Sequence, residues 1–485
     1  MNKSRILLII TIAIVVTLVA IAVTFFALRK SSDAYASCLP YDATSITRLD
    51  AKSFLSAAKL GPKDLLDLLR RTRDNQDSHD TQSLGIDVMR PIYAFSSATG
   101  NFGIVAAMDD IDDFEAFLEE ESKAGRASEI TRQRGFSWAT IGEQWLLAFD
   151  KEKALAMGPA VGAAQDQLRN EMARLMEQEK KDSGLQSSIY EELKKSDEPL
   201  AAVVAPEILP DATDRFLKQF SVSSKNDALL RISLETDDNE LEMDADIIAK
   251  SPAVKDHLNR INQLMRPIKG SQLNYAHADN VAWMALNVQG SELLDVLRSN
   301  QTVRTALIAL NLVLDLDRII RAIDGDVALE LTSTDIFDSS DIQIKHLYLT
   351  ADVANSDFLS NASTWGNQLI GVQALTQQDF AVNLGTSSVY FGVDKNTLYI
   401  SGERGLTKGE NAYLDDERSD IRDSRFYATV ALPQVISRLG ANTDLPAAVN
   451  NFQRLVFEME DAGEFKLKLI APRGMNIARE LLLAE

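Results

Sequence analysis

Apolar and polar residues alternate along many short stretches of this chain. In residues 230–234 and 465–469 every second side chain is apolar, and the side chains between them are Arg, Ser or Lys. A period of two places the apolar side chains on one face of a strand. Antiparallel sheets commonly pack one face on a core and leave the other face in water. The pattern therefore predicts an α+β fold of antiparallel sheets with packed helices.

The predicted elements run in the same order twice along the chain. Short turns separate paired apolar runs at equivalent places, at residues 99–101, 142–144 and 236–239 in the first half and near residues 333–341, 393–396 and 461–463 in the second. Paired runs around such turns are typical of β-hairpins. We therefore expect two tandem related lobes, residues 40–266 and residues 275–485. The alternative is two α+β domains that are merely similar.

The first predicted lobe contains a segment that has no counterpart in the second. Residues 160–181 end in EMARLMEQEKKD, a mixture of acidic and basic side chains at helical spacing. Mixed charges at this spacing are typical of a helix that faces water. The sequence predicts a solvent-exposed helical insertion at residues 160–181.

Residues 6–28 form an unbroken run of 23 residues in which Thr is the one polar type. At about 1.5 Å per residue, a helix of this length would be about 34 Å long, enough to cross a hydrocarbon core of about 30 Å. The run is longer than the apolar region of a cleavable signal peptide. We therefore predict a transmembrane signal anchor at residues 6–28, followed by a tether at residues 29–39.

The charges beside this run predict its orientation. Lys3, Arg5 and the α-amine precede it, whereas Arg29 and Lys30 follow it together with Asp33. Positive charge is enriched on the cytoplasmic side of membrane segments. We expect residues 1–5 to be a cytoplasmic tail and the ectodomain to be periplasmic. The chain is then a single-pass protein of a bacterial cell membrane, and the membrane is its first predicted partner, through residues 6–28.

The chain contains one cysteine, Cys38. One cysteine excludes an intramolecular disulfide and a cysteine zinc site. A large extracytoplasmic protein without disulfides favours a bacterial envelope over a eukaryotic secretory route. Residues 35–38 loosely resemble a lipobox, but nine residues, three of them charged, separate Cys38 from the apolar run. We expect Cys38 to be unmodified, with acylation as the alternative.

The net charge of −21 narrows the choice of partners. The first 30 residues have four basic and no acidic side chains, so the remainder has 46 basic and 71 acidic side chains, a net charge of −25. An acidic surface repels phosphate backbones. We expect no nucleic-acid partner.

Candidate metal ligands are few. Asp109, Asp110, Asp112 and Asp113 form an acidic cluster, but the glycine and the distal glutamate of an EF-hand are missing. These four residues are weak metal candidates, and a charged helix start explains them equally well. Asp324 and Asp326, around Gly325, are interpreted as a turn before a strand. The four histidines are isolated along the sequence and are interpreted as surface or structural residues: His79, His257, His277 and His346.

Known catalytic and cofactor-binding motifs are missing from the sequence. It contains no GxSxG elbow, no Walker A loop and no GxGxxG motif. We therefore predict no cofactor, assign no catalytic residue and lean against an enzyme.

Three short motifs suggest a relationship. Residues 49–55 (LDAKSFL), Gly85-Ile86-Asp87 with the following Pro91-Ile92-Tyr93, and residues 322–329 (AIDGDVAL) occur together with the repeated layout. In this combination the chain resembles a Bacteroidota family of membrane- or lipid-anchored envelope proteins of unknown function. The resemblance implies an envelope location and supplies no catalytic residues. Members are often lipoproteins, and the poor lipobox of this chain puts a lipid anchor in doubt.

The sequence favours a noncatalytic binding or scaffold module, held at the membrane and presented to an envelope protein or ligand. A carrier of a lipid or other hydrophobic ligand is one alternative, which an apolar cavity would favour. A carboxylate-based hydrolase of envelope glycans is another, which a cleft with two carboxylates about 5–10 Å apart would favour.

Overall fold

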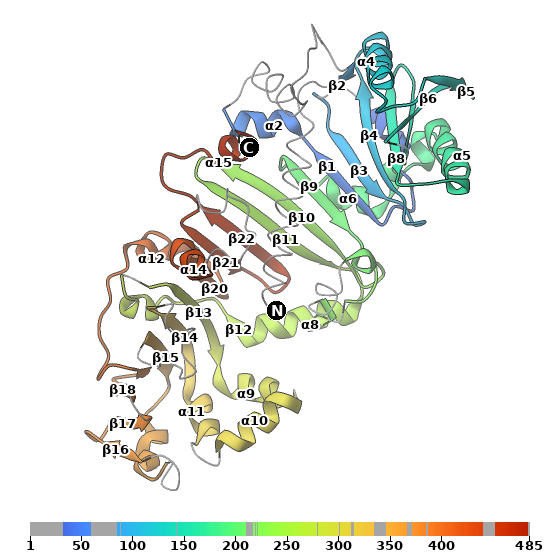
Figure 1. The fold of residues 1–485 in the computed structure, drawn as a ribbon. Helices are drawn as coiled ribbons and strands as arrows, with labels where there is room; N and C mark the ends of the chain where they lie inside the picture. Colours follow the sequence, from blue (N-terminus) through green and yellow to red (C-terminus); the bar gives the residue numbers. More distant parts are fainter. Residues whose placement is uncertain are drawn as a thin grey trace. The chain divides into compact units, whose positions relative to one another are not determined.

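A computed structural model provides the structure of the chain (Figure 1). The residues that it describes are 33–59, 85–87, 89–142, 144–209, 217–218, 220, 222–278, 280–299, 301–311, 315–333, 346–365, 371–384, 387–439 and 452–483. Contacts divide the chain into a first unit, residues 1–254 with 473–485, and a second unit, residues 255–472. Each unit is built mainly on one large antiparallel sheet with helices packed on it.

Within the described residues, the strands of the first unit form a sheet in which every pairing is antiparallel. Their order across the sheet is β5 (Thr131–Gln133), β6 (Phe136–Ile141), β7 (Trp145–Phe149), β8 (Lys153–Gly158), β4 (Phe102–Met108), β3 (Ile92–Ser96), β1 (Ser45–Leu49), β9 (Leu200–Val204), β10 (Ala228–Asp237) and β11 (Glu240–Ala249). A short strand, β2 (Ile86–Asp87), also pairs with β4.

Helical segments pack on both faces of this sheet. The segments η1 (Asp33–Cys38), α5 (Ala163–Glu177) and α6 (Ser188–Leu193) share one buried core with Ile46, Phe95 and Val203, which neighbour one another across three strands. On the opposite face, α4 (Ile111–Lys123) buries Phe114 and Leu118 in a second core. Both faces of the strands near α4 are therefore apolar, as a sheet covered on both sides requires.

Short elements complete the first unit. The helix α2 (Ala51–Ala57) begins at Asp50, whose carboxylate accepts from the amides of Lys52 and Ser53. The C-terminal helix α15 (Ile477–Leu483) contacts α2, β10 and β11. The remaining elements are η2 (Lys180–Asp182), η3 (Gly184–Gln186) and η4 (Pro206–Ile208), and α8 (Pro252–Leu264) starts at the end of this unit.

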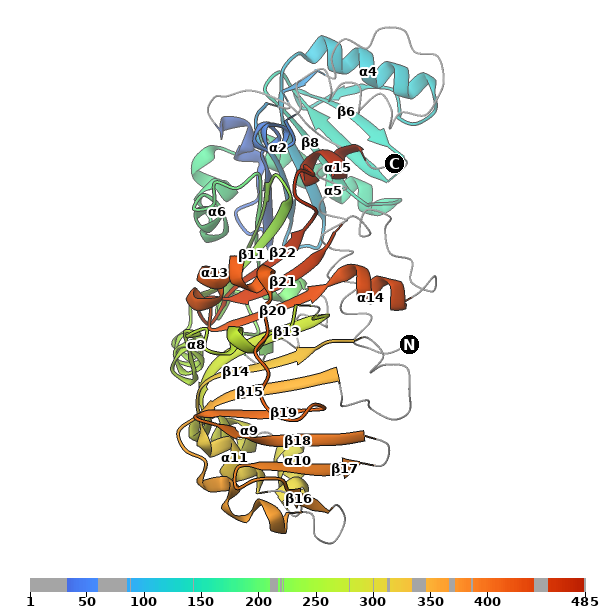
Figure 2. The ribbon, with the colours of Figure 1, turned by 90° about the vertical axis from the view of Figure 1, so that its left-hand side faces the viewer.

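The described strands of the second unit also form an antiparallel sheet, and several of them are seen side by side in Figure 2. Their order is β16 (Val372–Ala374), β17 (Asp379–Leu384), β18 (Ser387–Asp394), β19 (Thr397–Ser401), β15 (Leu347–Val353), β14 (Ile323–Leu331), β13 (Ala282–Gln289), β20 (Phe426–Ala431), β21 (Arg454–Met459) and β22 (Glu464–Ile470). A short strand, β12 (Met265–Arg266), pairs with the end of β13. The order of strands is the same as in the first sheet.

The two faces of the second sheet are covered differently. On one face, α9 (Gly290–Ser299), α10 (Gln301–Asn311), α11 (Leu316–Ala322) and η8 (Asp357–Thr364) form the cover. The other face is covered by residues 268–276, which include η5 (Gln272–Tyr275), and by α12 (Ala412–Asp416) and α13 (Arg418–Asp423). The helix α14 (Leu432–Leu439) follows β20. The candidate site lies on the face covered by η5.

The expected architecture, a transmembrane helix followed by two tandem lobes, is wrong as stated. Among the residues that the structure describes, no helix is long and apolar enough to cross a membrane, and the predicted span at residues 6–28 lies outside them. The units are also not consecutive stretches of chain. Residues 473–485 return to the first unit, where Ile477 N donates to Asp238 O and Asn476 Nδ2 donates to Ala57 O.

Two local expectations in the first unit are also wrong. Residues 33–39 do not form a tether, because η1 is folded there and Tyr35, Cys38 and Leu39 are buried in the core. The predicted insertion does contain a helix, α5, but the helix is not simply exposed. One of its faces packs in the core, through Leu168, Met172, Ala173, Leu175 and Met176. The apolar residues between the charges, rather than the charges, determine its position.

The environment of Cys38 generates a prediction about thiol chemistry. The Cys38 thiol is buried, lies 3.7 Å from Met176 Sδ, and has its pKa raised by that burial from 9.0 to about 12. At pH 8 the native chain then has roughly 1,000-fold less thiolate than the unfolded chain. We expect iodoacetamide to alkylate Cys38 far more slowly in the native protein than in urea, as measured by mass spectrometry.

The same pKa predicts a pH dependence of stability. The pKa of the Cys38 thiol is higher in the folded chain than in the unfolded chain. The neutral thiol therefore contributes fully to the free energy of unfolding below pH 9, and this contribution is lost between pH 9 and about pH 12. In Cys38→Ala, the decrease in the free energy of unfolding over this pH range should be smaller by the contribution of the thiol. Equal alkylation rates in the native and unfolded protein, or fatty-acid labelling of Cys38, would contradict the buried thiol.

Candidate functional site

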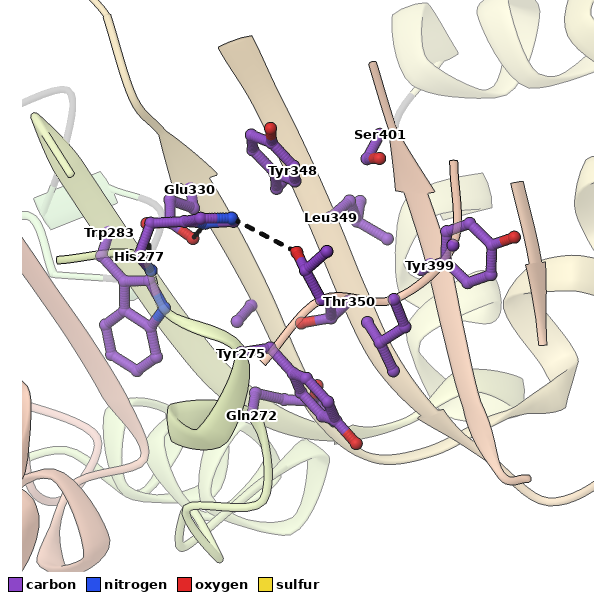
Figure 3. A pocket seen from close by; sticks show the side chains of 14 residues that line it. Gln272, Tyr275, His277, Trp283, Glu330, Tyr348, Leu349, Thr350, Tyr399 and Ser401 are labelled. Atoms are coloured by element: carbon purple, nitrogen blue, oxygen red, sulfur yellow. Dashed lines mark hydrogen bonds and ion pairs between the residues drawn. The ribbon is translucent and has the colours of Figure 1, made fainter. Parts of the chain in front are cut away.

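A small pocket lies in the second unit, on the face of the sheet that η5 covers (Figure 3). Its volume is about 20 Å³. The floor is formed by β13, β14, β15 and β19, and the walls by η5, His277 and the loop that follows β19. The pocket is lined by Gln272, Tyr275, His277, Trp283, Ala328, Glu330, Tyr348, Leu349, Thr350, Tyr399, Ser401, Gly405, Leu406 and Thr407.

Strand register explains why these side chains meet. Glu330 on β14 pairs with Trp283 on β13 and with Tyr348 on β15, so the three side chains form one row across the sheet. Thr350 pairs with Tyr399 in the neighbouring row. Residues directly opposite one another in adjacent strands point to the same face. The alternating pattern of β14 thus brings a carboxylate to a face that aromatic rings also occupy.

His277 is held in one orientation by Glu330. Its backbone N donates to Glu330 Oε1 at 2.8 Å, and its Nδ1 lies 3.0 Å from Glu330 Oε2. Since a carboxylate only accepts, Nδ1 carries a proton toward Glu330. Nε2 lies 3.5 Å from Thr407 Oγ1, and the ring packs on Tyr348 with centroids 4.4 Å apart. The imidazole is a fixed wall of the pocket.

The two loops that form the walls are joined to each other. Asn411 Nδ2 donates to His277 O at 2.7 Å, and Gly409 N donates to Asn274 O at 3.0 Å. A Cβ on Gly409 would come within 1.8 Å of Ala276 O, so the approach of the two backbones requires glycine at this position. These contacts hold the walls of the pocket together.

Below the pocket, the buried Asp326 and the half-buried Asp352 hold residues 269–272 on the sheet. Asp326 is fully buried and accepts from Lys269 N, from Ser271 N and from Asn287 Nδ2, each at 2.9 Å. Ser271 Oγ lies 3.0 Å from Asp326 Oδ2 and 2.7 Å from Asp352 Oδ2. We call Asp326 and Asp352 with their donors the carboxylate latch. It uses buried charge to fix a loop that has no strand pairing of its own.

Gly325 allows the two carboxylates of the latch to lie close together. The pairing of β14 with β15 shifts register between Ile323 and Val327, which is a β-bulge. Gly325 has φ +151° there, and a Cβ on it would come within 2.7 Å of the Asp352 side chain. Asp326 N donates to Asp352 Oδ2 at 3.1 Å. The bulge thus directs both carboxylates toward Ser271.

Gln272 connects the latch to the pocket. This residue is 2% exposed, and its Nε2 donates to Asp352 Oδ1 at 2.7 Å. Its other amide atom, Oε1, is buried and has no hydrogen-bond partner. Buried polar atoms in proteins nearly always have a partner. Gln272 therefore presents an unused acceptor among the residues that line the pocket.

A second buried polar cluster lies on the same face of the sheet and is internally paired. Lys468 Nζ lies 3.1 Å from Glu458 Oε1 and 3.3 Å from Asp420 Oδ2. Burial raises the pKa of Glu458, and burial also raises the pKa of Tyr413 to about 12. The Arg454 guanidinium lies 4.0 Å from the centroid of the Tyr413 ring. The cluster thus joins β21 and β22 to α12 and α13 through ion pairs and a cation–π contact.

The acidic cluster that the sequence offered as a metal candidate lies at the start of α4. Asp110 is the N-cap of that helix and accepts from the amides of Asp112 and Asp113 at 2.8 and 3.2 Å. Asp109 donates its amide to Gly85 O. Within the described ranges, no group of three or more His, Cys, Asp and Glu side chains is placed to hold a metal ion.

The three histidines that the structure describes lie in unrelated places. His79 lies outside the described residues. His257 is on α8, where burial and the nearby Arg260 lower its pKa. His346 lies beside Thr332, at the start of β15. The contacts of His277 were missed by the sequence, because its partner Glu330 is 53 residues away. The one sequence signal for this contact was the alternation of apolar and polar residues around Glu330. That alternation alone indicates that the Glu330 side chain faces water.

The fold and the pocket define an α+β protein built on antiparallel sheets, with a small polar site in its second unit. The chain belongs to the family described as Domain of unknown function (DUF4836), which matches residues 35–466. This match confirms that the family is one of unknown function. A comparison with curated proteins found no match.

Comparison with solved structures found similarity to the protein TP0453. Its crystal form IV is 11% identical, with 44% of this chain and 81% of that chain covered and a TM-score of 0.28. Its crystal form I is also 11% identical, with 49% of this chain and 88% of that chain covered and a TM-score of 0.28. At these TM-scores the likeness carries no argument about this chain.

The latch predicts unequal effects for two neighbouring aspartates. Asp326→Ala leaves the amides of Lys269, Ser271 and Asn287 buried without an acceptor, and we expect a loss of about 3 kcal/mol or more in the free energy of unfolding. Asp324 forms a largely exposed ion pair with Arg266, so Asp324→Ala should cost less than about 1 kcal/mol. Urea unfolding followed by tryptophan fluorescence measures both losses. Similar losses for the two variants would refute the latch.

Proposed function

We propose that this chain is a noncatalytic binding module of a bacterial cell envelope, and that the pocket of the second unit takes a small polar group of its ligand. The observation that supports this most is the fixed state of His277. Glu330 orients its backbone amide and its Nδ1, and two backbone-linked loops keep it in place. A rigid, partly buried wall of aromatic and polar side chains is suited to recognition.

The arrangement gives less support to a hydrolase. Asp326 and Asp352 each accept several hydrogen bonds from the protein, and Asp326 has no exposed surface on which a glycan could bind. His277 Nε2 and Thr407 Oγ1 are 3.5 Å apart, beyond the range of about 2.6–3.2 Å typical of a base and its nucleophile. A hydroxyl on an exposed loop at this distance is better suited to holding the loop in place.

The volume of the pocket also favours binding over lipid transport. A cavity of about 20 Å³ has room for one water-sized group. Pockets that enclose a drug-sized ligand are typically about 300–1,000 Å³. This pocket could therefore enclose one end of a ligand, while an acyl chain would need a far larger cavity.

The envelope location is a proposal from the sequence. The apolar run at residues 6–28 supports association with a membrane, and the single cysteine supports a bacterial envelope. The acidic net charge of −21 supports partners other than nucleic acids.

A binding screen tests the proposed function. The full chain is melted in the presence of four classes of probe: short peptides, oligosaccharides, small amines and fatty acids. A ligand at 100 times its Kd stabilises the native state by about 2.7 kcal/mol, so we expect at least one class to raise Tm measurably. Thr407→Phe, which places a bulky ring at the wall of the pocket, should abolish that rise. Thr131→Phe, an exposed position on β5, should leave it unchanged.

The same samples distinguish binding from catalysis. We expect mass spectrometry to recover every probe intact after incubation with the protein. Cleavage products that disappear in His277→Ala would establish an enzyme and refute the proposal. No Tm rise with any class, or an equal rise in Thr407→Phe, would refute the binding site.

A further inference from the structure

We propose that the apolar face of the sheet in the second unit contacts the lipid bilayer with which residues 6–28 associate. The inference rests on the membrane association proposed above, does not involve the pocket, and adds the surface that meets the lipid. Its basis is a difference in burial between the two faces of five neighbouring strands, β22, β21, β20, β13 and β14.

One face of these strands carries polar side chains and is buried. Asp326 and Glu330 of β14 and Glu458 of β21 lie on it, and all three are at most 4% exposed. Residues 268–276, α12 and α13 pack over this face. The fold thus spends its cover on the polar side of the sheet.

The opposite face of the same strands is apolar in two adjacent rows. In one row Leu329 of β14 pairs with Met284 of β13, and Met284 pairs with Ala428 of β20. The row consists of Leu467, Phe457, Ala428, Met284 and Leu329, all of them half-buried. The neighbouring row on these strands is equally apolar and half-buried. Antiparallel sheets commonly bury the apolar face and leave the polar face in water, so these strands show the reverse.

The two rows are large enough to be an interaction surface. Five strands about 4.8 Å apart and two rows about 7 Å apart make a plane of roughly 300 Å². At one end of the same face, α9, α11 and η8 share a core with Val288, Ala351 and Val353, which are buried. Met284 and Leu329 are not buried in this way. Apolar patches of a few hundred Å² mark places that meet a membrane or another protein.

The length of the connection to the apolar run favours a membrane. The run ends at residue 28 and the described chain begins at Asp33, so the two points are at most about 18 Å apart. The segment η1 is folded from Asp33 onward, and no long tether intervenes. A bilayer that takes up the run is therefore the apolar phase nearest to the folded chain.

Charge distinguishes this face from the rest of the surface. Residues 31–485 have 46 basic and 71 acidic side chains, a net charge of −25. Bringing charged side chains against lipid removes their hydration, which is costly. The side chains of the two rows are uncharged, and removing them from water is favourable. The bilayer is therefore the occupant that fits this face.

A fluorescent label on the face tests the proposal in the full chain. Leu329→Cys introduces a thiol in the apolar row, and NBD maleimide should label it alone because Cys38 is buried. The labelled chain is reconstituted with vesicles of phosphatidylcholine, a neutral lipid, and flotation measures its association with them. We expect the emission to fall at least twofold when the lipid carries a nitroxide on its acyl chains. The matched control Glu403→Cys, an exposed position of the same unit, should show no change.

A charge placed in the apolar row tests the same contact. Met284→Lys, added to the labelled Leu329→Cys chain, puts an ammonium beside the label, because the two positions pair across β13 and β14. A charged side chain is costly in hydrocarbon, so the quenching should be lost while flotation persists. Unchanged quenching would contradict contact through this face.

The outcomes separate this inference from the membrane association and from the pocket. Flotation without quenching at position 329, or equal quenching at positions 329 and 403, would overturn the lipid-facing surface and leave the membrane association in place. A blue shift at position 329 that follows protein concentration and not lipid would identify a second copy as the partner instead. Absence of flotation would refute both the association and this inference. None of these results changes the outcome of the probe screen with Thr407→Phe.

Discussion

The second unit depends on carboxylates, two of them buried and one half-buried, that accept hydrogen bonds from a neighbouring segment. Asp326 and Glu330 lie on one face of β14, and Asp352 lies on the same face of β15. Leaving such charges buried and unpaired would be costly. Residues 269–277 supply the donors, through the amides of Lys269, Ser271 and His277 and the side chain of Gln272. A polar sheet face is thereby converted into a packed one.

The pocket follows from this arrangement. The same segment that satisfies the carboxylates carries Gln272, Tyr275 and His277 into fixed positions above the strands. Its contacts with residues 409 and 411 then hold the opposite loop against it. The latch satisfies the Nε2 atom of Gln272. The positions of the side chains that line the pocket are therefore a consequence of how this segment is attached.

The sequence predicted the strands well and the covers of the sheets poorly. The hairpins predicted around residues 99–101 and 236–239 are confirmed as β3 paired with β4 and β10 paired with β11. A hairpin is predicted from the alternation of apolar and polar residues and from the turn between its two strands, and a short stretch of sequence contains both signals. The tether was wrong because the burial of Tyr35 and Cys38 depends on packing against elements such as α5, more than 100 residues further along the chain.

The same distinction explains why the site was missed. From the sequence, Asp326 is interpreted as part of a turn before a strand and Glu330 is not singled out, because polar side chains that alternate with apolar ones are expected on the wet face of an antiparallel sheet. Their partners lie 39–57 residues away in the chain, and two of the donors to Asp326 are backbone amides, which no residue type reveals. A polar strand face shows that carboxylates are gathered on one side. Residues 269–277 determine whether these carboxylates accept hydrogen bonds from the protein or from water. The placement of residues 269–277 depends in turn on the same carboxylates. Neither the carboxylates nor their donors can therefore be assigned from their own stretch of sequence.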